Sequence, residues 1–151
     1  MFHRLTLIGF FSLFLGIANA SAFDEVNTSF LGGLAVDGHD STAYFQKSAP
    51  TEGAEEYVVE YKGATWRFAD AKSRDLFAAA PDSYAPQYGG YCSNQMSLGN
   101  LADIDPGVWL IYDGKLYLFG HAAGRTRWET TGIPDRIKDA DENWRKFLAG
   151  K

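Results

Sequence analysis

The chain has 151 residues, 46% of them hydrophobic and 15% aromatic, so it is long enough to bury one core of ordinary size. Its net charge of −5, with 19 acidic residues against 14 basic ones, disfavours nucleic acid and anionic membranes as partners. The single cysteine, Cys92, excludes a disulfide framework within the chain.

The first residues follow the pattern of a secretory signal peptide. Basic Arg4 precedes an apolar run over residues 5–17, and the small residues Ala18 and Ala20 favour cleavage after Ala20, with cleavage after Ala22 as the alternative. A retained membrane anchor is the alternative, but the run is shorter than the ~20 residues that a span needs. We therefore predict a signal peptide over residues 1–20 and an exported, soluble mature chain, periplasmic or secreted, with no membrane partner.

The next part of the chain predicts a flexible lead-in and then the start of a domain. Residues 21–34 are mixed and polar and form the lead-in, and residues 35–148 form the domain. A short strand that enters a turn is expected over residues 35–40, because Asp-Gly is a strong turn dipeptide. One helical turn, capped by Asp40, should follow over residues 41–47.

Two hairpins, each followed by a helix, are the clearest secondary structure. The strands 56–61 and 65–68 are rich in β-branched and aromatic residues, and Asp70 should cap a helix over residues 71–80. Further helices are expected over residues 122–130 and 135–148. The second hairpin joins strands 108–112 and 115–119 through Asp113-Gly114, the dipeptide of a type I′ turn. This order predicts an α+β fold, with a small antiparallel sheet built from hairpins and helices packed on one face.

The segment 84–92 (YAPQYGGYC) lies between these two regions and is the most distinctive stretch of the chain. Its two adjacent glycines allow unusual backbone angles or close approach of another group. It ends at Cys92, and a short helix should follow over residues 91–98. We predict Tyr88, Gly89, Gly90 and Tyr91 as residues that line a binding site.

Several segments together resemble the YHS-domain family, and more closely its exported bacterial branch. The resemblance spans most of the mature chain. It is carried by residues 43–45 (AYF), 61–69 (YKGATWRFA), 74–77 (RDLF), Pro81, 84–92 (YAPQYGGYC) and 113–118 (DGKLYL). The family is suspected of metal binding, most often of copper.

The family's usual metal ligands do not carry over to this chain. In its short members, two cysteines four residues apart follow the second hairpin strand, and the matching positions here hold Ala69 and Ser73. Neither side chain is a good ligand for a soft metal. A metal site would therefore have to depend on Cys92.

The soft-metal hypothesis names Cys92 first, with Met96, His39 and His121 as partners, since thiolate, thioether and imidazole are the ligands that soft metals prefer. Cys92 and Met96 would share one helix face if residues 91–98 are helical. Cu(I) is the expected ion, ahead of zinc. The alternatives are a buried Cys92, Met96 as core filler, His39 as a loop residue and His121 as a helix cap.

Two other function classes remain open. Thiol catalysis by Cys92 stays open but is the less favoured class, because the chain has no second thiol to resolve an intermediate. A binding module for a small ligand or a protein is the main alternative to metal binding, with a structural Cys92. Its pocket would be lined by aromatic side chains, for which the candidates are Trp66, Tyr84, Tyr88, Tyr91 and Trp109.

Overall fold

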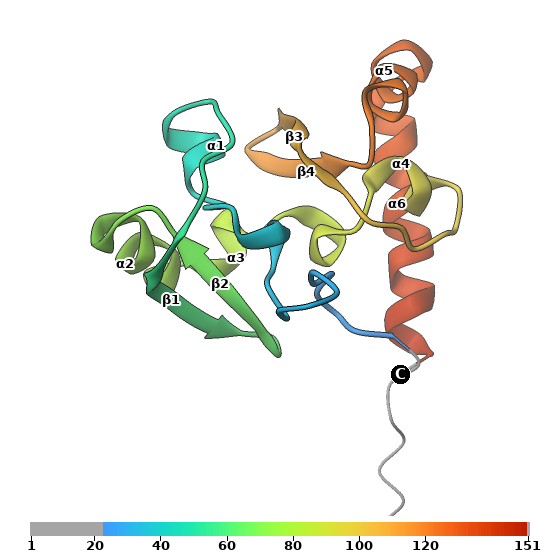
Figure 1. Ribbon diagram of the computed structural model, residues 1–151. Helices are drawn as coiled ribbons and strands as arrows, with labels where there is room; N and C mark the ends of the chain where they lie inside the picture. The colour runs from blue at the N-terminus through green and yellow to red at the C-terminus, as the bar shows by residue number, and fades with distance from the viewer. Residues whose placement is uncertain (1–22, 151) are drawn as a thin grey trace, which may run out of the picture.

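The structure is a computed structural model that describes residues 23–150, so the predicted signal peptide over residues 1–20 lies outside the described residues. The α+β prediction is confirmed. Figure 1 shows the two hairpins apart, with α2 beside the first and the long helix α6 beside the second. The elements are the turn η1 (Val36–Gly38), α1 (Ala43–Gln46), β1 (Ala54–Tyr61), β2 (Ala64–Phe68), α2 (Ala71–Ala79), α3 (Pro81–Tyr84), the turn η2 (Gln87–Gly90), α4 (Ser93–Ser97), β3 (Asp105–Tyr112), β4 (Lys115–Phe119), α5 (Ala122–Thr131) and α6 (Ile133–Ala149).

Local sequence signals place most of these elements correctly. The Asp70 carboxylate accepts a hydrogen bond from the Ser73 backbone at 2.8 Å and so caps α2, as predicted. Asp113 and Gly114 both have positive φ, of 48° and 70°, which is the type I′ geometry of a two-residue hairpin. The strand expected over residues 35–40 is instead the turn η1.

The two hairpins form separate two-stranded sheets, and the described residues contain no single sheet that joins them. The outer edge of β2 is already occupied by the preceding chain. The Ala35 backbone N–H donates to the Thr65 carbonyl at 3.0 Å, and the Thr65 N–H donates to the Gly33 carbonyl at 3.1 Å. Because each backbone group bonds one partner along that edge, the second hairpin cannot pair there.

The residues predicted as a flexible lead-in are packed into the fold in their described part, residues 23–34 (the N-terminal segment). Val26 is buried, and the Asn27 N–H donates to the Gly89 carbonyl at 2.8 Å. Phe23 packs edge-on against Trp144 with ring centroids 5.7 Å apart. The mixed composition of this segment hides these contacts, since they depend on partners far away in the sequence.

The two halves of the fold repeat one supersecondary unit. In each half a turn with three consecutive positive-φ residues leads to a short helix, a hairpin and a capped helix. Both hairpins have an eight-residue and a five-residue strand, with a register shift at the equivalent place. The turns η1 and η2 thus correspond to each other, as do α1 and α4, β1–β2 and β3–β4, and α2 and α5.

In the turns that open the two repeats, this duplication is almost invisible in the sequence. Residues 36–44 (VDGHDSTAY) align with residues 88–96 (YGGYCSNQM), and the two segments share only one glycine and one serine. The positive-φ positions of η1 are Val36, Asp37 and Gly38, whereas those of η2 are Tyr88, Gly89 and Gly90. The backbone path is therefore retained while the side chains differ, and Asp40 of the first repeat occupies the place of Cys92 in the second.

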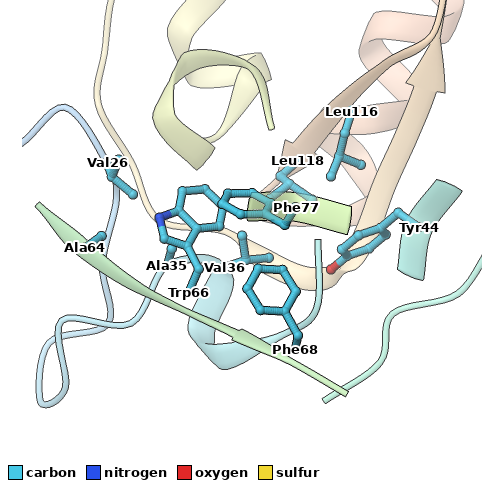
Figure 2. Packing of buried hydrophobic residues seen from close by; sticks show 10 residues of the cluster. All are labelled: Val26, Ala35, Val36, Tyr44, Ala64, Trp66, Phe68, Phe77, Leu116 and Leu118. Carbon is cyan, nitrogen blue, oxygen red and sulfur yellow. The ribbon is translucent and has the colours of Figure 1, made fainter. Parts of the chain in front are cut away.

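Strand β4 joins the two halves because both of its faces are buried. Leu116 and Leu118 belong to the first core cluster and point from β4 into it (Figure 2). Tyr117 and Phe119, on the other face, belong to the second. The first core cluster comprises Val26, Ala35, Val36, Tyr44, Ala64, Trp66, Phe68, Phe77, Leu116 and Leu118. The second comprises Tyr88, Cys92, Met96, Tyr117, Phe119, Trp128 and Ala140.

Within residues 23–150, no helix has both the length and the apolar composition that crossing a membrane requires.

Candidate functional site

A pocket of about 260 Å³ lies where the N-terminal segment, the first hairpin, the turn η2 and helix α6 meet. Its aromatic walls come from four parts of the chain: Tyr61 from the end of β1, Trp66 from β2, Tyr88 from η2 and Trp144 from α6. The remaining lining residues are Glu25, Val26, Lys62, Asp82, Ala85, Pro86, Gln87 and Gly89. Elements of both repeats therefore contribute to one concave surface.

Close backbone packing holds the N-terminal wall of this pocket in place. A Cβ atom built on Gly89 would lie 1.9 Å from the Glu25 carbonyl oxygen, so only glycine allows this approach. The side chain of Asn27 also donates to the Gly90 carbonyl, at 3.4 Å. The Tyr91 hydroxyl donates to the Asp24 carbonyl at 2.9 Å, which ties the segment to the chain just before Cys92.

The donors of three wall aromatics are used inside the protein. The Trp66 indole N–H donates to the Tyr61 carbonyl at 3.0 Å, and the Tyr88 hydroxyl donates to an Asp141 carboxylate oxygen at 2.9 Å. Burial, together with the charge and hydrogen bond of Asp141, raises the pKa of Tyr88 well above its ordinary value. The Tyr61 hydroxyl donates to Asp82. These bonds fix the orientations of the three rings, of which Trp66 and Tyr88 are almost wholly buried.

Three charged side chains, Lys62, Glu25 and Asp82, lie at the mouth of the pocket. The Lys62 ammonium lies 3.2 Å from a Glu25 carboxylate oxygen, 3.9 Å from one of Asp82, and 5.4 Å from the centre of the Tyr61 ring. Partial burial lowers the pKa of Lys62, but the hydrogen bond to Glu25 and the interactions with Tyr61 outweigh it, so the pKa is raised overall. Lys62 is thus a cation at neutral pH, held by two carboxylates and an aromatic ring.

The residues predicted to line a binding site divide into two groups. Trp66, Tyr88 and Gly89 line the pocket, whereas the candidates Tyr84 and Trp109 do not. Gly90 is buried in η2, and Tyr91 contacts the N-terminal segment and packs near Trp144, with ring centroids 6.4 Å apart, instead of lining it. The sequence also did not point to Tyr61, Lys62 or Trp144. Their only sequence signal is their residue type, because no local spacing connects them with Tyr88.

Cys92 is 3% exposed and lies at the start of α4, in the second core cluster. Its sulfur accepts a hydrogen bond from the Gly120 backbone N–H at 3.2 Å. In the first repeat the carboxylate of Asp40 accepts the equivalent bond from Ala69, at 3.0 Å. Cys92 therefore takes part in a contact that both repeats use to hold the chain after the hairpin.

Of the other predicted metal ligands, Met96 and His121 have structural roles, whereas His39 lies in the other repeat from Cys92. Met96 is fully buried in the second core cluster, and His121 caps α5 by accepting the Gly124 N–H at its Nδ1, at 3.3 Å. His39 lies in the first repeat, where its backbone pairs with Glu52. Its Nδ1 is buried without a hydrogen-bond partner among the described residues. Within residues 23–150, no three His, Cys, Asp or Glu side chains are grouped to hold a metal ion, so Cys92, His39 and His121 do not form one site.

We expect Cys92→Ser to reduce the free energy of unfolding by about 1–3 kcal/mol, because a buried hydroxyl would replace a well-packed sulfur. The shorter C–O bond would also lengthen the 3.2 Å contact with Gly120. Urea denaturation followed by tryptophan fluorescence measures the change. Ser83→Ala, at an exposed position of α3, is the control and should leave the midpoint unchanged. An unchanged midpoint for Cys92→Ser would contradict a structural role for the thiol.

Comparison of the chain with family models, with curated proteins and with solved structures gives no significant match.

Proposed function

We propose that this chain is an exported binding protein that holds a small organic molecule in the pocket between its repeats. The observation that carries the proposal is the convergence of Tyr61, Trp66, Tyr88 and Trp144 on one concave surface. Ligand sites are typically concave and supplied with a few convergent polar groups, which here come from Glu25, Lys62, Asp82 and Gln87. A volume of about 260 Å³ suits a small ligand.

The walls of the pocket are ordered in the absence of a ligand, and this supports the same proposal. Trp66 and Tyr88 are 2% and 4% exposed, and their polar atoms are bonded within the protein. Tyr88 also packs against Trp144, with ring centroids 6.3 Å apart. The walls of the pocket are therefore already in place before a ligand arrives, which reduces the entropy lost on binding.

The test uses four probes of different chemistry: phenol, indole, choline and glucose. Each is titrated into the protein while the indole N–H resonances of Trp66 and Trp144 are followed by NMR. We expect saturable shifts with at least one probe. Gln87→Phe places a large ring in the pocket lining and should weaken that binding by about tenfold or more, because it removes the space the ligand occupies.

Gln46→Phe is the matched control for this experiment, since Gln46 is exposed on α1 and lies outside the pocket. It should bind the probe as the unaltered chain does. The proposal fails if no probe gives a saturable shift, or if Gln87→Phe and Gln46→Phe bind equally well.

Soft-metal binding through Cys92 is a second proposal, and membership of the YHS family would be consistent with it. The observation in its favour is that Cys92 and Met96 both pack in the second core cluster, one turn of α4 apart, as the spacing predicts. One equivalent of Cu(I), taken up under reducing conditions and lost in Cys92→Ser, would support it. A folded protein that takes up no Cu(I) would remove it.

A further inference from the structure

We infer that the ligand of this pocket is an organic cation, a molecule with an alkylated ammonium group of about the size of choline. This inference rests on the proposed function and adds the chemical class of the ligand. It follows from which groups around the pocket remain able to interact, from their charge, and from the position of Lys62.

Three of the four wall aromatics offer a ligand no free donor. The hydroxyls of Tyr61 and Tyr88 and the indole N–H of Trp66 donate to partners within the protein. A neutral polyol or an anion would have to use the donors of Lys62, Gln87 and Trp144, and the Lys62 ammonium is already held by Glu25 and Asp82. An ammonium group needs none, because it is stabilised by carboxylates and by the electron-rich faces of aromatic rings.

The charge of the pocket favours the same class. Glu25 and Asp82 contribute two negative charges to the lining and Lys62 one positive charge. The full chain also carries a net charge of −5. An anionic ligand would meet two carboxylates at the mouth, whereas a cation would be attracted to them.

Lys62 already shows how the mouth of the pocket stabilises a cation. Its ammonium stands between Glu25 and Asp82 and over the Tyr61 ring, which are the contacts that a ligand ammonium would make. Its side chain is 44% exposed and lies in the hairpin turn after β1, and exposed ion pairs of this kind contribute little to stability. A ligand cation can therefore replace the Lys62 ammonium at small cost and also contact Trp144.

The experiment compares choline with its neutral carbon analogue, in which a tert-butyl group replaces the trimethylammonium group. The two molecules have the same shape and hydroxyl and differ only in charge. We expect choline to bind about tenfold more tightly by calorimetry, the size of effect that cation–aromatic and carboxylate contacts give at a partly desolvated site.

A matched pair of variants connects the effect with the pocket. Asp82→Asn removes a carboxylate whose side chain is 86% exposed, so the fold should be unaffected, and choline should bind several-fold more weakly while the neutral analogue does not change. Asp75→Asn removes an exposed carboxylate on α2, outside the pocket, and should change neither affinity.

The outcomes separate the inference from the proposed function. Equal or tighter binding of the neutral analogue, or a choline affinity that does not respond to Asp82→Asn, would overturn the inference and leave a binding pocket for another class. Binding of phenol, indole or glucose with no binding of choline would have the same meaning. If none of these molecules binds, the inference and the proposed function both fail.

Discussion

Phe77→Ala is expected to lower the free energy of unfolding by about 3–5 kcal/mol, the usual cost of deleting a buried aromatic ring. Phe77 is fully buried and lies against Trp66 and Phe68, with ring centroids 4.9 and 5.0 Å away. It is the only large buried side chain of α2, where Ser73 is the other buried residue. Its loss therefore removes the contact that holds α2 on the first hairpin.

Urea denaturation measures this change, with tryptophan fluorescence as the probe because Trp66 packs directly on the deleted ring. Val58→Ala is the control: Val58 is 41% exposed on β1, so its truncation should alter stability by no more than about 0.5 kcal/mol. Phe77→Leu keeps part of the volume and should fall between the two. Similar midpoints for Phe77→Ala and Val58→Ala would show that this cluster does not stabilise the fold as described.

Gly89→Ala is expected to displace the N-terminal segment and to cost about 2–5 kcal/mol, since backbone strain and overpacking act together. The added Cβ would lie 1.9 Å from the Glu25 carbonyl oxygen, at a residue whose φ is +61°. The segment cannot move aside without breaking the 2.8 Å bond from the Asn27 N–H to the Gly89 carbonyl. Hydrogen exchange should therefore accelerate at Asn27.

The variant Gly114→Ala is the control that distinguishes the cost of backbone strain from the cost of a steric collision. Gly114 has a similar φ of +70°, but no heavy atom lies within 4 Å of the place that an added Cβ would occupy, so the variant should cost only the left-handed strain of about 1–2 kcal/mol. Hydrogen exchange at Asn27 should not change in this control. If both variants lose the same stability and Asn27 exchanges equally in both, the close approach of Gly89 to Glu25 is not important.

The elements that the sequence predicts well are those specified by neighbouring residues. The Asp113-Gly114 turn and the Asp70 cap each depend on a few consecutive side chains, and both occur as expected. The separation into two sheets was not predictable in the same way. Whether the hairpins pair depends on what occupies the edge of β2. The backbone of residues 33–35 occupies it. This contact joins segments far apart in the chain, so no local sequence pattern predicts it.

The site was predicted only in part for the same reason. Tyr88 and Gly89 belong to a distinctive segment and line the pocket, but Tyr61 and Trp144 reach it from distant parts of the chain. The proposed metal ligands were chosen by residue type. Residue type does not place side chains in space, and the fold gives His121 a capping role and leaves His39 in the other repeat from Cys92.

By itself, the sequence determined the α+β class, most helices and both hairpins, and the importance of the segment around Gly89. These follow from short-range preferences of the backbone and from hydrophobic patterning. Only the tertiary structure decided that the fold is a repeat, that the N-terminal segment is packed, and that four aromatic residues share one pocket. The physical reason is that these features depend on backbone angles and long-range contacts, which chemically different residues, such as Asp40 and Cys92, can satisfy equally.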